Sequence, residues 1–271
     1  MPAVAHPAAA AAPLLEMHGL RLDSARQPGR VLLDQVDWRV LPGDFWVLGG
    51  LQGAGKSEFL TLAAGLVSPA SGSFRLLDTD LSPRDSSLPL EARLRIGVLL
   101  EGGQLQVRLT VAENVALPYC YHHDCRIEEC CDWVEALLEF TGTRAVALQS
   151  PLTIRRNWRL RAGLARALVL KPQLLLLDNP LSGLDPHQVE WWRVRLLELA
   201  RGHPLFEGNP ITVIATALDL HPWRGVARQF AILKDRRLVQ GDAALAADAA
   251  AEQLQSQLVN SKAQLPGAMN Q

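Results

Sequence analysis

The 271-residue sequence has few cysteines, few aromatic residues and no excess of either charge. Its 27 basic and 28 acidic side chains give a formal net charge of −1. Because no long-range field attracts it to polyanions, we expect no nucleic-acid partner. The 4 cysteines all lie between Cys120 and Cys131, unlike the dispersed cysteines of a disulfide-stapled secreted domain. These features predict a cytoplasmic protein.

The sequence also has no apolar run of membrane-spanning length and no charged N-terminal leader. The best candidate for a spanning segment, residues 163–177, is interrupted by Arg166 and Lys171. Residues 1–13 are rich in Ala and Pro and contain no Lys or Arg, so we interpret them as a disordered lead and not as a secretory signal. Residues 245–271 are rich in Ala and Gln and are predicted to be a weak helix or disordered.

A phosphate-loop motif, G-x-x-x-x-G-K-[ST], is the strongest signal in the chain. It consists of Gly50, Leu51, Gln52, Gly53, Ala54, Gly55, Lys56 and Ser57. Its glycines let backbone N–H groups turn towards phosphates, and the following helix N-terminus adds partial positive charge. The motif predicts that Lys56 contacts the β- and γ-phosphates and that the Ser57 hydroxyl binds Mg²⁺. Glu58 adds a carboxylate that weakens binding unless Mg²⁺ or an arginine screens it.

A second phosphate-site element follows an apolar run much later in the chain. Residues 174–177 are four leucines, and Asp178 comes directly after them. This is the Walker B pattern, which places a carboxylate at the carboxyl end of a strand, where it holds Mg²⁺ through water. The next residues are Asn179, Pro180, Leu181, Ser182, Gly183, Leu184, Asp185 and Pro186. Two such elements in this order predict a magnesium-dependent nucleotide site.

Hydrophobic periodicity and turn residues predict the elements around these motifs. Strands are expected at 14–22, 31–40, 45–48, 73–77, 97–100, 174–178, 211–216 and 230–233. Helical patterns occupy 58–64, 110–142 and 159–170. Thr110 followed by Glu113 is a capping box, which marks the start of a helix.

With these motifs in this order, the sequence resembles the ATP-binding subunits of ABC transporters, which carry a D-E-P-T-S-G-L-D-P run at 178–186. Residues 109–115 look like the start of that family's helical subdomain, and 165–168 like the helix before its Walker B strand. The resemblance implies an α/β P-loop NTPase fold. It would comprise a RecA-like core, an antiparallel β-subdomain and an inserted helical subdomain at about 105–160. We therefore assign residues 14–244 to one ABC-type nucleotide-binding domain.

The resemblance also implies ATP and Mg²⁺ as cofactors and a face-to-face homodimer or heterodimer of ATP-binding subunits. The implied partner is a transmembrane permease subunit, which we expect to dock near residues 101–118. The implied location is the cytoplasm, peripheral on the inner face of the cell membrane. More loosely, the loop at 102–105 and the helix that begins at Thr110 resemble the lipid-transport (MCE-associated) branch.

Several residues depart from the family pattern where its chemistry occurs. The family's catalytic glutamate follows the Walker B aspartate, and here that residue is Asn179, an amide that cannot accept a proton from attacking water. Ala217 occupies the expected position of the switch histidine, so the γ-phosphate loses that donor. Glu101 replaces the family's glutamine, and its carboxylate can bind Mg²⁺ or substitute as the base but cannot donate a hydrogen bond. The expected metal ligands are Ser57, Asp178 and Glu101.

The elements that face the partner subunit and the base depart as well. The family's L-S-G-G-Q signature falls on residues 154–158, Ile-Arg-Arg-Asn-Trp, which lack its two glycines. The aromatic residue that stacks on adenine is missing, with Ser24 or Ala25 at that level. The sequence keeps the groups that hold β-phosphate and Mg²⁺ and loses those that cleave the γ-bond. It therefore predicts ATP binding with weak or absent hydrolysis and no intact catalytic residue.

Two further clusters of side chains have alternative interpretations. The first is Arg155, Arg156, Arg159 and Arg161, which either face a partner's triphosphate or form a solvated basic helix start. The second is the run Cys120–Cys125 with Cys130 and Cys131, which has metal-capable side chains. Because its spacings fit no standard zinc pattern, we expect a structural role and no stoichiometric zinc.

Two hypotheses for the function remain open. The first is an ATP-binding subunit of an ABC transport system that couples Mg²⁺–ATP binding to a membrane permease. The alternative is a non-transport ATP-gated clamp or a regulatory ATP-binding protein. A P-loop small-molecule kinase is disfavoured, because residues 182–185 match the dimer interface of the ABC family and no arginine-bearing lid is evident.

Overall fold

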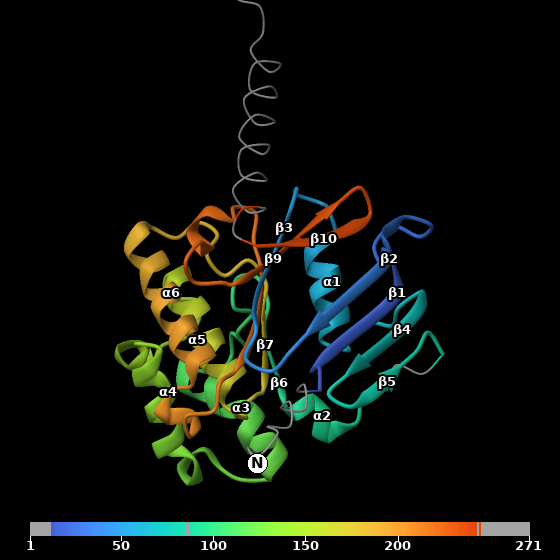
Figure 1. Cartoon of the computed structure of the whole chain (residues 1–271). Helices are drawn as coiled ribbons and strands as arrows, with labels where there is room; N and C mark the ends of the chain where they lie inside the picture. Colours follow the sequence, from blue (N-terminus) through green and yellow to red (C-terminus); the bar gives the residue numbers. More distant parts are fainter. Residues whose placement is uncertain (1–11, 85–86, 243, 245–271) are drawn as a thin grey trace, which may run out of the picture.

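The computed structural model describes residues 12–84, 87–242 and 244, which form two β-sheets with helices on both sides of the larger one (Figure 1). The antiparallel sheet has the spatial order β2 (Val31–Val40), β1 (Leu15–Asp23), β4 (Ser71–Leu76) and β5 (Thr79–Leu81). The larger sheet has the order β10 (Arg237–Gly241), β9 (Gln229–Lys234), β3 (Phe45–Gly50), β8 (Thr212–Thr216), β7 (Leu174–Leu177) and β6 (Ile96–Leu99). The predictions for the two tails concern residues that, apart from 12 and 13, lie outside this description.

The helices divide between the two faces of the larger sheet. They are α1 (Lys56–Ala63), α2 (Leu90–Leu94), α3 (Val111–His123), α4 (Cys131–Phe140), α5 (Arg156–Leu168) and α6 (Pro186–Arg201). Short 3₁₀ turns lie at η1 (Ile127–Glu129), η2 (Arg144–Val146), η3 (Pro204–Phe206) and η4 (His221–Trp223). In Figure 1, α3 to α6 lie on one side of the sheet, and α1 with the antiparallel sheet lies on the other. This is the arrangement expected from the resemblance: a RecA-like core, an antiparallel β-subdomain and a helical subdomain.

The larger sheet is parallel from β6 to β9, and only β10 runs antiparallel to its neighbour. The carboxyl ends of parallel strands meet at one edge of a sheet, where α/β proteins bind their ligands. The phosphate loop follows β3, Asp178 follows β7, and the 216–219 segment follows β8. The fold thus brings these distant segments to the same edge.

Continuous apolar strands are required because both faces of the larger sheet are buried. In β7, Leu175 and Leu177 belong to the core under α3–α6, whereas Leu174 and Leu176 belong to the core under α1 and the antiparallel sheet. The same alternation holds in β3, where Val47 faces the first core and its neighbours face the second. Four consecutive leucines are therefore a strand between two cores.

Close packing at Gly97 seats α5 against the sheet. A Cβ atom built on this residue of β6 would lie 2.4 Å from the carbonyl oxygen of Ala167, closer than any side chain tolerates. Glycine therefore lets the helix backbone approach the strand. This contact fixes the last turn of α5 relative to the core.

The helical stretch predicted at 110–142 consists of two helices, α3 and α4. Thr110 and Glu113 form the expected capping box at the start of α3. However, α3 ends at Asp124, whose φ of 49° is left-handed, and the chain turns through η1 before α4 begins. The turn lets both helices bury apolar side chains in one core, including Val115 and Leu137. Packing against this one core therefore accounts for two helices joined by a turn within the predicted helical stretch.

Four elements had no counterpart in the sequence expectations: helix α2, strands β5 and β10, and helix α6. The edge strands β5 and β10 are short, and β10 is mostly exposed, so neither has a strong apolar pattern. The turn from β9 into β10 uses Asp235 and Arg236, both with positive φ, and contains no glycine to mark it. Helix α6 begins at an Asp185 cap, whose side chain accepts a hydrogen bond from the backbone of Gln188.

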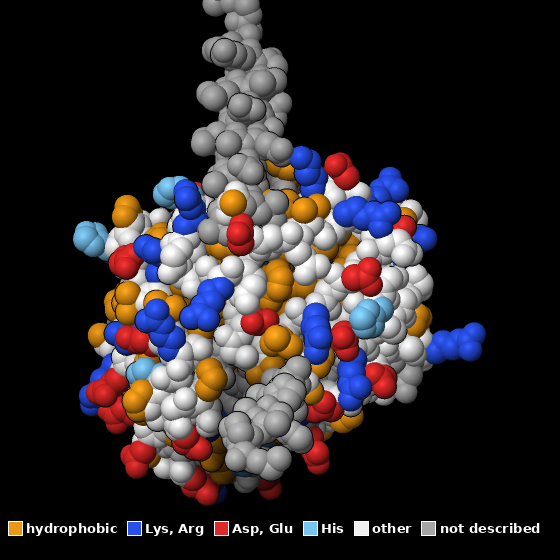
Figure 2. Space-filling model, in the orientation of Figure 1, with side chains coloured by type: hydrophobic (Ala, Val, Ile, Leu, Met, Phe, Trp, Pro, Cys, Tyr) orange, Lys and Arg blue, Asp and Glu red, His pale blue; other side chains and the backbone are white. Residues whose placement is uncertain are grey.

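The surface carries charges of both signs. On the face drawn in Figure 2, Lys and Arg side chains are interspersed with Asp and Glu, as the balanced composition requires. None of the helices in the described part of the chain combines the length and apolarity needed to cross a bilayer.

Candidate nucleotide-binding site

The phosphate loop joins β3 to α1 and holds its lysine inside the loop. The Lys56 ammonium donates hydrogen bonds to the carbonyl oxygens of Gly50 at 2.7 Å and Leu51 at 2.9 Å. Lys56 is only 9% exposed, and burial lowers its pKa below the ordinary value, while the charge of Asp178 opposes this shift. A buried cation with a depressed pKa is complemented by an anion, so the loop fits a phosphate group.

Gly50, the first glycine of the loop, is required by the backbone. Its φ is 145°, and an added Cβ would lie 2.9 Å from the carbonyl oxygen of Leu233 in β9. Any other residue would displace the loop from the neighbouring strand. Glycine at this position therefore lets the phosphate loop start close against strand β9.

A hydrogen-bonded network links the ends of β7 and β8. The Thr216 hydroxyl donates to the Asp178 carboxylate at 2.7 Å and accepts from the Asn179 backbone N–H at 2.9 Å. Thr216 is fully buried, and Asp178 is 6% exposed. A charge-assisted bond of this kind fixes the carboxylate rotamer in the position from which it can bind a metal or metal-bound water.

One cavity of about 620 Å³ contains the main residues of this site. It is lined by Ser24, Arg26, Gln27, Arg30, Gln52, Gly53, Gly55, Lys56, Ser57, Glu58, Thr61, Leu100, Glu101, Gln104, Asp178, Asn179, Thr216 and Leu218. The expected metal ligands Ser57, Asp178 and Glu101 therefore share one space. A hydroxyl and two carboxylates are oxygen donors, the ligand type that Mg²⁺ prefers.

The end of the cavity towards the β1–β2 hairpin is polar. Ser24 donates a hydrogen bond from its hydroxyl to the Glu58 carboxylate at 2.9 Å, and the Arg30 guanidinium donates to the Gly53 carbonyl at 3.0 Å. Glu58 is thus bonded to a side chain on the hairpin. Ser24, one of the two residues expected at the level of the family's adenine-stacking aromatic, places a hydroxyl in the cavity lining.

Comparison with known proteins identifies the family to which this site belongs. The sequence profile described as ABC transporter matches residues 33–182, more than half of the chain. The chain belongs to the ABC transporter family. It is 39% identical over 153 residues to the "Probable ribonucleotide transport ATP-binding protein mkl" of Mycobacterium leprae (strain TN), covering 56% of this chain and 44% of that protein.

A second relative aligns over more of the chain. The "Methionine import ATP-binding protein MetN 2" of Rhodococcus jostii (strain RHA1) is 33% identical over 211 residues, which cover 77% of this chain and 59% of that protein. The chain therefore spans about half the length of these relatives. Among solved structures, the ADP- and Pi-bound dimer of the ATP-binding cassette MJ0796 has a TM-score of 0.73 at 22% identity, covering 84% of this chain and 98% of that one. This likeness shows the ABC cassette fold.

The structure corrects one residue of the predicted site. Ala217, expected at the switch position, is 3% exposed, and its backbone N–H donates to the Leu48 carbonyl within the sheet. It is not among the residues that line the cavity, whereas Leu218 is, with 41% of its surface exposed. Within the 216–219 segment, Leu218 therefore lines the cavity and Ala217, the residue expected at the switch position, does not. The conclusion that no imidazole lies there is unchanged.

The segment at the ABC signature position packs inwards. Ile154 is 5% exposed in the core under the helices, and Trp158 packs against the same core. Arg156 donates a hydrogen bond to the Ser182 carbonyl, and Arg159 donates to the Ile154 carbonyl at 3.1 Å. The side chains of this segment therefore make contacts within the chain, and the segment does not form an open glycine-rich surface.

Arg161 does not face a partner's triphosphate. It is 8% exposed, its guanidinium lies 3.7 Å from the ring centroid of Trp191, and it donates to the Gln188 side chain at 2.6 Å. The hypothesis of four outward arginines is therefore wrong at this position. Arg155 is exposed. Trp192 in α6 is fully buried in the core.

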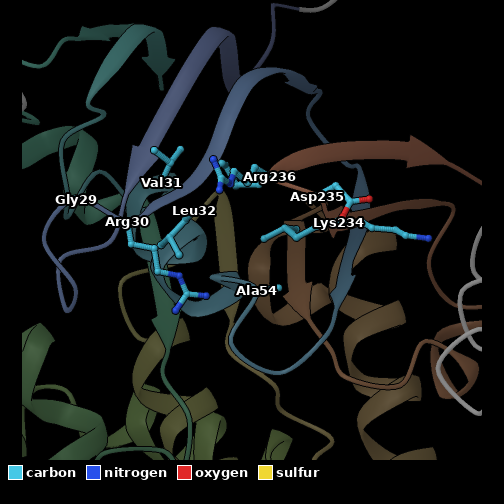
Figure 3. Close-up of a pocket in the computed structure, with 10 residues that line it drawn as sticks. Gly29, Arg30, Val31, Leu32, Ala54, Lys234, Asp235 and Arg236 are labelled. Carbon is cyan, nitrogen blue, oxygen red and sulfur yellow. The ribbon is translucent and has the colours of Figure 1, made fainter. Parts of the chain in front are cut away.

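A smaller cavity of about 370 Å³ adjoins the site (Figure 3). It lies between the start of β2, the phosphate loop and the β9–β10 turn. Arg30 lines both cavities, and Figure 3 shows it extending towards Ala54 of the loop. Sequence reasoning missed Arg30 and the positioning residue Thr216. The latter has a sequence signal, a hydroxyl at the end of an apolar strand, whereas Arg30 has none.

Proposed function

We propose that this chain is the ATP-binding subunit of an ABC transport system and that it binds Mg²⁺–ATP with weak or absent hydrolysis. One observation carries the proposal. Lys56, Ser57 and Asp178 line the same cavity as Asn179, the residue expected at the position of the family's base, and as Leu218, an alkyl side chain from the segment expected to carry the γ-phosphate donor. The groups for binding are gathered, and those for hydrolysis are replaced beside them.

In the binding role, the loop amides and Lys56 would hold the β- and γ-phosphates. Ser57 and Asp178, with Glu101 as a third oxygen donor, would hold Mg²⁺, which supplies positive charge against the phosphates. Asn179 keeps the attacking water unactivated because an amide is not a base. With a hydroxyl at Ser24 in place of the aromatic, discrimination between bases should be low.

The docking of a permease is supported by apolar side chains on the helical subdomain. Val107 is 51% exposed and Leu152 is 72% exposed, and Ser150 connects them by accepting from the Leu152 N–H and donating to the Val107 carbonyl. Arg166 donates to the carbonyls of Gly103 and Gln104, which fixes the loop before α3. In this proposal the subunit acts as a homodimer or heterodimer at the inner face of the cell membrane.

The test measures equilibrium ATP binding and steady-state phosphate release on wild type, Lys56→Ala and Lys171→Ala. We expect Mg²⁺-dependent binding by wild type that falls by about 100-fold in Lys56→Ala, from the loss of a charge-assisted contact worth about 3 kcal/mol. Lys171, an exposed lysine paired with Glu207, serves as the matched control and should bind as wild type does.

Phosphate release from wild type should equal that of Lys56→Ala. Robust release by wild type that disappears in Lys56→Ala would contradict the proposal and point to Glu101 as a substitute base. Co-purification from membranes then separates the two functional hypotheses, since a bound permease supports transport and its absence supports the regulatory alternative.

A further inference from the structure

Three cysteine thiols converge in the helical subdomain, away from the nucleotide cavity. The Sγ atoms of Cys120, Cys125 and Cys130 all lie within 4.8 Å of one another, and those of Cys120 and Cys130 are 3.7 Å apart. We call these residues the three-thiol cluster. The sequence spacing C-x₄-C-x₄-C matches no standard zinc motif, and for that reason the sequence predicted no zinc here. The convergence of the thiols is a product of the fold and argues against that prediction.

The backbone between α3 and α4 is built to bring these thiols together. Asp124 ends α3 in the left-handed conformation, and the Cys125 N–H then bonds back to the Cys120 carbonyl at 3.2 Å. The η1 turn follows, in which the Glu129 carboxylate accepts from the Arg126 N–H at 2.9 Å. At the end of the η1 turn, the Cys130 N–H donates a hydrogen bond to the Ile127 carbonyl at 3.2 Å. The cluster thus lies on a hydrogen-bonded turn.

The sulfur separations match a metal site better than a disulfide. A disulfide requires about 2.05 Å between sulfurs. In a tetrahedral zinc site with Zn–S bonds of about 2.3 Å, the sulfurs lie about 3.8 Å apart. The 3.7 Å between Cys120 and Cys130 is within about 0.1 Å of that tetrahedral edge, and the other two separations are at most 4.8 Å.

We propose that Cys120, Cys125 and Cys130 bind one Zn²⁺ ion through three thiolates, with a fourth position open to water or another exogenous ligand. Binding releases three thiol protons to solvent and changes no oxidation state. Thiolates select soft or borderline ions, and Mg²⁺ and Ca²⁺ prefer oxygen. No other His, Cys, Asp or Glu among the described residues joins the cluster, which leaves the fourth position open.

The ion would fasten the end of α3 to the start of α4. Cys120 lies in the last turns of α3, and Cys130, at 5% exposure, immediately precedes α4. The half-exposed Cys120 and Cys125 give the ion a route from solvent. This inference is independent of the proposed function, because none of the three residues lines the nucleotide cavity.

Cys131 provides a matched control within the same turn. It is exposed, and its thiol contacts the Asp132 carboxylate at 3.6 Å outside the cluster. The experiment titrates the reduced full-length chain with Zn²⁺ against a chromophoric chelator, and with Co²⁺ as a spectroscopic probe. Wild type and Cys131→Ser should bind one Zn²⁺ per chain and show thiolate-to-cobalt charge-transfer absorption. Cys120→Ser and Cys125→Ser should each bind at least tenfold more weakly.

Folding of the variants is checked by circular dichroism and thermal unfolding. Zn²⁺ should raise the Tm of wild type and Cys131→Ser and leave that of the Cys120→Ser/Cys125→Ser double variant unchanged. Because Cys125 is half-exposed, its single variant keeps the test valid if the double variant unfolds. Zinc uptake that persists without Cys120 and Cys125, no stoichiometric uptake by reduced wild type, or uptake of Cu(I) but not Zn²⁺ would each overturn the proposal.

Discussion

The two halves of the nucleotide cavity contrast in chemistry although they share one space. The binding half consists of Lys56, Ser57 and Asp178, which present a cation, a hydroxyl and a carboxylate. The hydrolytic half consists of Asn179 and Leu218, which present an amide and an alkyl chain. Because Asn179 directly follows Asp178 at the end of β7, the contrast lies in side-chain chemistry and not in the fold. An ABC cassette can therefore keep its binding geometry while its hydrolytic groups change.

The same contrast extends to the segment that would face a second subunit in the proposed dimer. The phosphate loop uses glycines to turn backbone donors towards a ligand, whereas the signature segment at 154–158 has no glycine and buries Ile154 in its own subdomain. The phosphate loop has the geometry of an anion site, whereas residues 154–158 pack within the chain. Substitutions in the two segments can therefore be tested separately.

The largest effect should come from the binding half. Asp178→Asn keeps an oxygen that can accept from the Thr216 hydroxyl but removes the charge that attracts Mg²⁺. We expect the affinity for Mg²⁺–ATP to fall by about 10- to 100-fold, the cost usual when a group that supports a metal is removed. Calorimetric titration with and without Mg²⁺ measures this, with Asp235→Asn, on the β9–β10 turn, as control. An unchanged Mg²⁺ dependence would mean that Asp178 does not support the metal.

A smaller effect should follow from repairing the hydrolytic half. Asn179 has a φ of 49°, a region that Asn and Asp tolerate best, so Asn179→Asp restores a carboxylate with little strain. Alone it should not raise phosphate release, because groups that act together are not additive. Combined with Leu218→His it should raise release by less than about tenfold, limited by the signature segment.

The position of the histidine makes that experiment a test of the fold as well. Ala217→His should lower Tm without raising phosphate release, since Ala217 is buried in the sheet, whereas the exposed Leu218 accepts a larger polar side chain. If Ala217→His gave the higher rate of release, the segment after β8 would have the opposite register to the one described.

The smallest effect should come from the exposed arginine of the signature segment. Arg155→Ala should leave the affinity for ATP within about twofold, because surface charges outside the cavity contribute little at physiological salt. Equilibrium binding at two salt concentrations measures this. A loss of tenfold or more would place Arg155 at the phosphates and remove the distinction between the two halves.

Much of the site could be predicted from local patterns. The phosphate loop was found because glycine, lysine and serine at fixed spacing must lie between a strand and a helix. Asp178 was found because four leucines buried between two cores end at the ligand edge of the sheet. The position of Asn179 follows from that of Asp178, the residue before it, so predicting an amide in place of the base requires no knowledge of the tertiary fold.

Other features depended on contacts between distant segments. The sequence placed Ala217 in the site, but the pairing of β8 with β3 and β7 decides that Leu218 faces the cavity. Arg161 was grouped with its neighbours as an outward charge, and only the packing of α6 against α5 shows it covered by Trp191. A one-residue shift in a strand or helix reverses which side chain is buried, and local sequence does not fix that shift.

The sequence by itself determined the chemistry available to this protein: a lysine for phosphate, a hydroxyl and a carboxylate for Mg²⁺, and an amide where a base would act. The tertiary structure decided which side chains meet. It turned the chain at Asp124 and gathered three thiols spaced five residues apart, because the two helices on either side bury their apolar faces in one core. The sequence specifies which side chains are present, but the burial of apolar residues in a shared core decides which of them lie close together.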